Sequence, residues 1–316
     1  MNPLRPFSTV VVISVLGFAV GPSCATSTTR TMEGDVARVL ISSDQENQLG
    51  LQLKTDMESK QGVVYMTDPQ VVGYVRAVAG KVIALGKRDR SDVNWQVFVI
   101  DDRKTVNAFA TPGGYLYVYR GLLETAQNEA ELAGVMAHET GHVVARHAAR
   151  SLVAAYGLET VVAMATGNNP GMVAQLAGSI ASKGLLLAHS RQDETEADEY
   201  GARYAAGAGY DPHGLVSFFQ RLMQQSGDTT GVMAYLSDHP STQERVNYVN
   251  AYIASQHLAG TELGAAPYAQ IRQRLAILPT ATPAAPGAAP AAAPPSAAPP
   301  AAAPPAAAPP PAARPH

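Results

Sequence analysis

The stretch that organises this chain is His138-Glu139-Thr140-Gly141-His142. In a helix, two histidines four residues apart project from the same face, with their Cβ atoms about 5–6 Å apart, so both imidazoles can reach one metal ion. Glu139 then lies beside that ion, where its carboxylate can act on a water molecule. A motif this short also occurs by chance, so the rest of the sequence has to supply the support for a metal site.

Composition and charge limit the classes of function. The chain has 316 residues, a formal net charge of -3 and a hydrophobic fraction of 46%. Because there is no basic excess to neutralise a phosphate backbone, nucleic acid is excluded as a partner on charge grounds. We expect one metallopeptidase domain at residues 41–278, of mainly α-helical α+β class, with a small sheet beside the motif helix. Nothing in the sequence indicates the oligomeric state.

The N-terminal segment has the pattern of a secretion signal. A basic residue precedes an apolar run at residues 10–20, which is too short to span a bilayer and matches the centre of a signal peptide. We therefore assign residues 1–25 to a signal. Lipidation of Cys24, the only cysteine, and ordinary cleavage after Ala25 both stay open. Either one predicts export to the periplasm, and the first adds a lipid anchor in the outer membrane.

Two further segments are expected to lie outside the folded domain. Residues 26–40 follow the signal and are predicted to form a tether, polar at its start. Residues 279–316 are almost entirely alanine and proline, a composition that cannot bury a core. We expect this tail to be an extended, disordered spacer.

A small sheet is expected just before the motif helix. Apolar alternation at residues 95–100 indicates a strand, and residues 107–119 indicate a hairpin that turns at Pro112-Gly113-Gly114. Its second strand places three tyrosines on one face, which suits a partly buried sheet face. An edge strand of this hairpin could also hydrogen-bond an extended peptide beside the metal.

The motif helix itself is predicted to begin near Asn128 and to continue to about Arg150. On a continuous helix, His147 lies roughly 140° around the axis from His142 and cannot bind the same ion. We expect it to make a structural hydrogen bond on the other side. Residues 151–187 are predicted to form two loosely packed helices, and one hypothesis is that they act as a lid over the site.

A carboxylate has to complete the metal site. Two histidines and a water leave a tetrahedral zinc ion one ligand short, and Ala148 stands where a metzincin has its third histidine. On a helix over residues 191–206, Glu194 and Asp198 share a face with Gly201, whose small size lets two helices pack closely. We therefore predict Glu194 as the third ligand and Asp198 as the acceptor that orients a ligand histidine.

The other acids of this stretch have a simpler interpretation. A run of charges on a helix is usually a solvated face. That interpretation suits Asp193, Glu196 and Glu199.

Two possible donors lie further along the chain. His239 and Arg245 are hydrogen-bond donors, and donors aimed at a developing oxyanion would complete a hydrolase site. A histidine before a proline is also commonly structural, so both interpretations of His239 stay open, as does the possibility that it blocks the site.

In this combination the motifs resemble the zinc metallopeptidase family that includes HtpX and the CAAX prenyl proteases, in its soluble, exported BepA-like bacterial branch. The resemblance covers about residues 40–255 and rests on motifs in the family's order: Asn107-Ala108-Phe109-Ala110, Pro112-Gly113-Gly114, Arg120-Gly121-Leu122-Leu123, His138-Glu139-x-x-His142, Glu194-x-Glu196-Ala197-Asp198 with Gly201, and His239-Pro240 followed by Arg245. The alanine and proline tail lies outside the family pattern.

The resemblance implies one zinc ion per chain, bound by His138, His142 and Glu194, with Glu139 as the catalytic base. It further implies that Asp198 supports the site and that His239 and Arg245 lie near a bound polypeptide.

At the level of function, the resemblance implies an endopeptidase that removes misfolded or misassembled envelope proteins. Two alternatives stay open: a non-proteolytic envelope chaperone or scaffold that uses the same cleft, and a zinc hydrolase that acts on a non-peptide bond.

Overall fold

The computed structural model describes residues 41–183, 188–225, 232–240 and 242–279, and every structural statement below refers to them. The predicted signal peptide with Cys24, the tether, and the predicted tail beyond Pro279 lie outside these residues. Domain boundaries therefore remain predictions from sequence.

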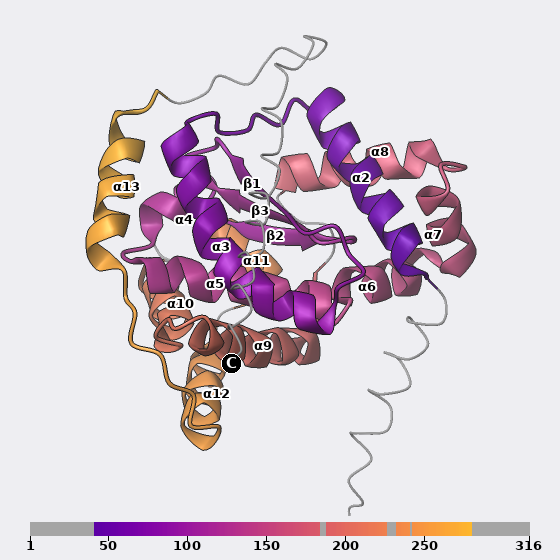
Figure 1. Cartoon of the computed structure of the whole chain (residues 1–316). Coiled ribbons are helices and arrows are strands. Elements are labelled where there is room, and N and C mark those ends of the chain that lie inside the picture. Colours follow the sequence, from indigo (N-terminus) through magenta and orange to yellow (C-terminus); the bar gives the residue numbers. More distant parts are fainter. Residues whose placement is uncertain (1–40, 184–187, 226–231, 241, 280–316) are drawn as a thin grey trace, which may run out of the picture.

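The described chain is mainly helical, with one small sheet, as predicted (Figure 1). Side chains that accept hydrogen bonds from free N–H groups of the first turn start several of the helices, among them Ser42, Asp68, Asn128, Ser190 and Thr242. The elements in chain order are α2 (Ser43–Ser59), α3 (Pro69–Asp89), β1 (Gln96–Ile100), β2 (Ala108–Thr111), β3 (Tyr115–Tyr119), α4 (Arg120–Thr125), α5 (Glu129–Val144), α6 (His147–Tyr156), α7 (Leu158–Ala165), α8 (Pro170–Lys183), α9 (Arg191–Gly207), α10 (His213–Gln225), α11 (Val232–Asp238), α12 (Gln243–Ser255) and α13 (Ala265–Ile277).

The sheet has three strands in the order β1-β3-β2. Strands β2 and β3 form the predicted antiparallel hairpin, with Phe109 opposite Tyr117, and β1 runs parallel to β3. Gly113 and Gly114 make the turn with φ values of +82° and +84°, a region that only glycine enters readily. Because β3 is the central strand, β2 lies at an edge of the sheet, where it contacts the motif helix α5.

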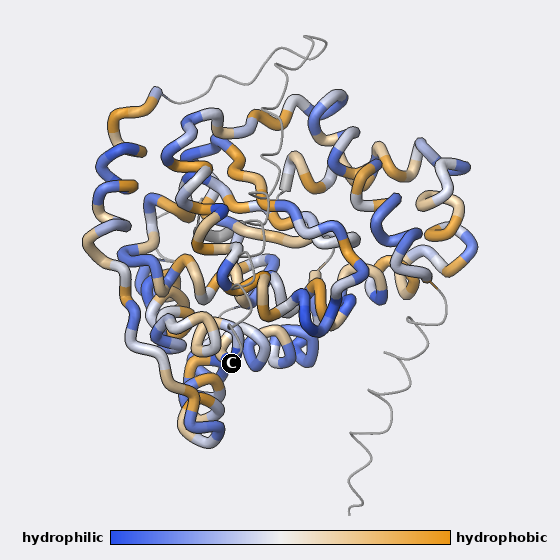
Figure 2. Tube along the Cα trace, viewed as in Figure 1, coloured by the Kyte–Doolittle hydropathy of each residue, from blue (hydrophilic) through white to orange (hydrophobic). Residues whose placement is uncertain are grey.

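The two faces of the sheet belong to two different cores. Leu116 and Val118 point into a core shared with α3, α5, α9 and α10, whereas Tyr115, Tyr117 and Tyr119 point into a second core formed with α2, α6, α7 and α8. All five side chains of β3 are buried, so the tyrosine face is more fully covered than the sequence predicted. In Figure 2 the strands are mostly hydrophobic, whereas much of α9 is hydrophilic.

The motif helix is shorter than predicted. It ends at Val144, and Arg146, which has the left-handed φ of +61°, interrupts the helix before α6 begins at His147. The guanidinium of Arg146 donates to Glu46 Oε1 at 2.7 Å and to the carbonyl of Ile41 at 2.6 Å. These contacts from the α2 region hold the break, and nothing in the local sequence indicates them.

The described part of the segment after the motif forms three helices, α6 to α8, rather than the predicted two. Their buried side chains, among them Leu152, Met164 and Leu176, pack with α2 against the tyrosine face of the sheet. Within the described residues no single helix has the length and apolarity of a membrane span, although α6 and α7 meet that test as a pair bent by 119°.

Candidate metal centre

Helix α5 places the motif residues in the interior. Asn128 caps its N-terminus by accepting from the backbone N–H of Glu131, and all sixteen residues of the helix are buried. The Nε2 atoms of His138 and His142 lie 3.0 Å apart, so both rings turn toward one point, as the spacing predicted.

Helix α9 brings the predicted carboxylate to the same point. Glu194 Oε2 lies 3.6 Å from His138 Nε2, and its Oε1 lies 3.5 Å from His142 Nε2. The close packing comes from Gly201, where an added Cβ would lie 3.3 Å from the backbone N and Cα of His138. The capping box of Ser190 and Asp193 fixes the start of this helix.

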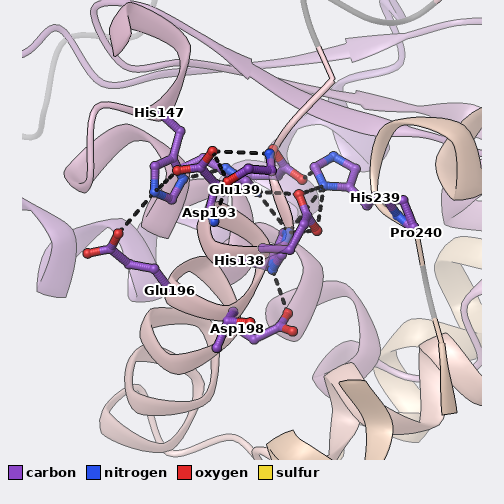
Figure 3. A network of polar contacts seen from close by, with 12 residues as sticks. His138, Glu139, His147, Asp193, Glu196, Asp198, His239 and Pro240 are labelled. Atoms are coloured by element: carbon purple, nitrogen blue, oxygen red, sulfur yellow. Dashed lines mark hydrogen bonds and ion pairs between the residues drawn. The ribbon is translucent and has the colours of Figure 1, made fainter. Parts of the chain in front are cut away.

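His239, which follows α11, completes the cluster from the fourth side. Its Nδ1 lies 3.3 Å from His138 Nε2 and 3.0 Å from Glu194 Oε1, and Figure 3 shows its ring turned toward His138. The side chains of His138, His142, Glu194 and His239 have no more than 2% of their surface exposed. The cluster is thus closed on all sides in this conformation.

The donor atoms fit a zinc ion. Bonds of about 2.0–2.1 Å in a tetrahedral arrangement place neighbouring donor atoms roughly 3.3 Å apart. The five distances above run from 3.0 to 3.6 Å around one centre. Burial lowers the pKa of His138 and of His142, which keeps both imidazoles neutral, as metal ligands must be.

Asp198 and Arg245 lie behind the donor atoms. His138 Nδ1 is 2.9 Å from Asp198 Oδ1, as expected of a carboxylate that orients a ligand histidine. Arg245 donates to both oxygens of Asp198, at 2.7 and 2.9 Å, and its Nη1 lies 2.8 Å from Glu194 Oε2. The guanidinium therefore binds two carboxylates of the site instead of projecting freely toward a substrate.

Glu139 lies beside the cluster with a carboxylate that has few partners. Its Oε1 is buried and makes no hydrogen bond among the described residues, and the Nε2 of His239 lies 3.5 Å away. Burial raises the pKa of Glu139 to about 8, although the charge of His239 acts in the opposite direction. A carboxylate with a pKa near neutrality can both take up and return a proton.

Two further histidines lie beside the cluster. For His147 the sequence predicted a structural hydrogen bond, but on the other side of the helix. His147 makes a hydrogen-bond contact with His142, their Nδ1 atoms 2.8 Å apart, so its predicted position on the far side is wrong. The angular argument assumed a continuous helix, and the break at Arg146 turns His147 back toward the site. His189 stacks on His142 with ring centroids 4.1 Å apart, and no motif pointed to it.

Two of the acids assigned to a solvated face instead contact His147. Asp193 Oδ1 and Glu196 Oε2 each lie 3.3 Å from its Nε2. Glu199, by contrast, bonds to the exposed Tyr248.

This fold and this set of donors define a metallopeptidase domain of the HExxH type. The chain belongs to peptidase family M48, whose family model matches residues 69–253. The matched region contains every residue of the cluster, Glu139, Asp198 and Arg245.

Three curated proteins show the range of relatives. The mitochondrial metalloendopeptidase OMA1 of Schizosaccharomyces pombe is 34% identical over 180 residues, which cover 57% of this chain and 52% of that protein. The beta-barrel assembly-enhancing protease of Escherichia coli is 27% identical over 252 residues, 76% of this chain and 50% of that protein. The metalloprotease YcaL of Escherichia coli is 32% identical over 187 residues, 58% of this chain and 71% of that protein. The chain spans about half the length of the first two.

Proposed function

We propose that the protein is a zinc-dependent endopeptidase of the bacterial cell envelope that cleaves misfolded or misassembled envelope proteins. The observation that carries the proposal is the buried set of His138, His142 and Glu194 donors around one point, with the Glu139 carboxylate beside it. A binding module would have no need of this base.

In the proposed reaction, Glu139 acts as general base and then as general acid. It takes a proton from the water that attacks the peptide carbonyl carbon, and it returns the proton to the amide nitrogen as the C–N bond breaks. His138, His142 and Glu194 would hold a zinc ion, which would supply Lewis-acid polarisation and lower the pKa of the attacking water toward neutrality. Asp198, clamped by Arg245, holds His138 in the orientation that this requires.

Strand β2 is the proposed docking site for the polypeptide. It is one of the two edge strands of the sheet and contacts α5, so an extended substrate could pair with its outer side, beside the helix that carries Glu139. Pairing of this kind reads the backbone and tolerates many side chains, which suits clients selected for being unfolded.

We further propose that His239 gates the site. Its Nδ1 lies in the fourth donor position, and the cluster is closed to solvent, so a substrate carbonyl can enter only after His239 withdraws. Of the roles that the sequence left open for His239, this one fits its position better than a donor to the oxyanion in the described conformation.

The cellular setting is inferred from sequence and relatives. The predicted signal at residues 1–25 supports export, with Cys24 lipidated at the outer membrane or lost after cleavage at Ala25. The name of the Escherichia coli relative refers to β-barrel assembly, which supports envelope proteins as clients. Mass spectrometry of the mature N-terminus distinguishes the lipidated form from the cleaved one.

The test compares cleavage of an unfolded β-barrel protein by the wild-type chain, by the chelator-treated chain and by Glu194→Ala. We expect cleavage by the wild type alone, with restoration by Zn²⁺ after chelation but not in Glu194→Ala, which lacks a ligand. Holding of the client without cleavage in all three samples would instead support the chaperone alternative. Cleavage of small esters but of no peptide would support the hydrolase of non-peptide bonds.

A further inference from the structure

The outward nitrogen of each ligand histidine has a partner of its own. His138 Nδ1 faces Asp198 at 2.9 Å, whereas His142 Nδ1 faces another imidazole, His147 Nδ1, at 2.8 Å (Figure 3 shows His147). A contact of this length between two imidazole nitrogens requires that one carries the hydrogen and the other accepts it. The tautomer of His142 therefore determines the tautomer of His147, and the reverse.

The direction of this hydrogen bond follows from the surroundings. His142 turns its Nε2 toward the cluster, so as a neutral ligand it must carry its proton on Nδ1. His147 then accepts on Nδ1 and carries its own proton on Nε2. That nitrogen faces Glu196 Oε2 and Asp193 Oδ1, each at 3.3 Å, and carboxylates can only accept when ionised. Each nitrogen and oxygen in this series of hydrogen bonds, from His142 through His147 to the two carboxylates, therefore has a consistent role as donor or acceptor.

The fold holds this chain of contacts at both ends. At one end, Arg150 Nη2 lies 2.5 Å from Asp193 Oδ1 and 3.8 Å from Glu196 Oε2. At the other, the contacts of Arg146 with Glu46 hold the break that turns the start of α6 toward α5. The side chain of His147 is fully buried, so water does not compete for either nitrogen.

The same side chains invite a different interpretation. His142, His147 and His189 form a second group whose nitrogens lie within 4.8 Å of one another, which could suggest a second metal ion. His142 would then have to bind two ions through both nitrogens and lose its remaining proton. The carboxylates facing His147 Nε2 instead stabilise the tautomer that a hydrogen-bond chain needs.

We propose that His147 is a positioning residue of the metal centre: it accepts the Nδ1 proton of His142, and Glu196 and Asp193 fix its tautomer, which keeps the His142 ring in the orientation for zinc. This inference rests on the proposed zinc site. It assigns His147 no contact with the substrate.

The test measures the zinc dissociation constant of the full chain by competition with a chromophoric chelator. His147→Leu removes the acceptor, and we expect zinc binding to weaken about 10- to 100-fold, the usual effect of losing such a partner. His147→Gln keeps an acceptor and should recover much of this loss. His213→Leu, at an exposed histidine that bonds only to Asp211 among the described residues, is the control and should bind zinc like the wild type.

A spectroscopic readout separates positioning from packing. In the zinc-loaded, ¹⁵N-histidine-labelled chain, we expect a protected Nδ1–H signal from His142 that persists in His147→Gln and exchanges rapidly in His147→Leu. If His147→Leu does not fold, Glu196→Gln, which removes one carboxylate from a side chain that is 25% exposed, should still weaken zinc binding.

The outcomes distinguish this inference from the proposed function. A folded His147→Leu that binds zinc within twofold of the wild type would overturn the positioning role, and so would equal losses in the Leu and Gln variants. A wild-type chain that binds no zinc would overturn the proposed function itself.

Discussion

The charge of each residue at the metal centre is set by burial and by a few close partners. Burial alone would raise the pKa of Glu194, but the charge of His239, its hydrogen bond to the carboxylate and the charge of Arg245 outweigh burial and hold the carboxylate ionised. Burial would likewise lower the pKa of His239, and the charge of Glu194 reverses this and raises it to about 9. In the metal-free protein at neutral pH these two residues therefore form a buried ion pair, which favours the closed position of His239.

Removal of this histidine tests the gate. In His239→Ala we expect faster hydrolysis of a short unstructured peptide, because the site no longer has to open. If the open form is about 1–10% populated in the wild type, the increase is about 10- to 100-fold. Cleavage rates are compared at equal zinc occupancy. A fall in rate with zinc retained would instead support the role of oxyanion donor.

Sequence predicted individual residues best where one local periodicity decides their direction. The spacing of His138 and His142, and the face shared by Glu194, Asp198 and Gly201, are enough to indicate which way these side chains point. Arg245 was placed near the site, but its contacts with two acids could not be read from spacing, because they depend on how α12 packs against α9.

At the scale of elements, the contact between α5 and α9 sets the geometry of the metal centre. An added Cβ on Gly141 would lie 2.7 Å from Tyr200 Cβ and 3.1 Å from the carbonyl oxygen of Ala197. These atoms belong to the helix that carries Glu194. The distance between the two helices therefore controls the distance between the donors.

Gly141→Ala should push the two helices apart. We expect a loss of unfolding free energy of about 1–3 kcal/mol from overpacking, which exceeds the gain of about 1 kcal/mol in helix propensity. Weaker zinc binding should accompany it. Gly73→Ala in α3 is the control, since an added Cβ there meets nothing within 4 Å and should stabilise slightly. Urea denaturation of the metal-free proteins measures the unfolding free energy of both variants. Equal stability of Gly141→Ala and Gly73→Ala would contradict the account.

The N-terminus of α3 is linked to α13 through one carboxylate. Asp68 accepts from the backbone N–H of Val71 and also binds Arg274, at 2.6 and 3.0 Å. The hydrogen bond with Arg274 lowers the pKa of Asp68 below its usual value. A lowered pKa in the folded state adds stability that is present above the usual aspartate pKa and is lost progressively as the pH falls from there through the lowered pKa of the folded state.

Two substitutions separate these contributions. Asp68→Asn keeps the cap, because asparagine caps helices well, but should lose the part of stability that disappears in acid. Asp68→Ala loses both, at a cost of about 1 kcal/mol for the cap alone. Unfolding free energies measured from pH 7 down to pH 3 separate the contribution of the helix cap from that of the ion pair with Arg274. An acid dependence of Asp68→Asn equal to that of the wild type would exclude the ion pair as its source.

Breaks between elements were harder to predict than the elements. The sequence around Arg146 continues a helical pattern, and the break comes from contacts with Ile41 and Glu46, about a hundred residues earlier in the chain. The same break turned His147 toward His142. The two errors in the sequence-based account of this region therefore have one cause.

At the scale of the whole molecule, the sheet divides the protein into a core that carries the chemistry and a second core built on α2 and α6 to α8. The fold class followed from local patterns, since strand alternation and helix periodicity are short-range signals. The closed state of the site could not be predicted, because it requires α11 to bring His239 onto donors from α5 and α9.

The central claim is that this cluster is a zinc centre whose catalytic base is Glu139, and the Glu139→Gln variant tests it most directly. The measurement is zinc content by elemental analysis together with the rate of peptide cleavage in the same preparation. We predict one zinc per chain, as in the wild type, and a cleavage rate reduced by about 10²- to 10⁴-fold or more. A Glu139→Gln chain that holds zinc and cleaves peptides at the wild-type rate would contradict the account.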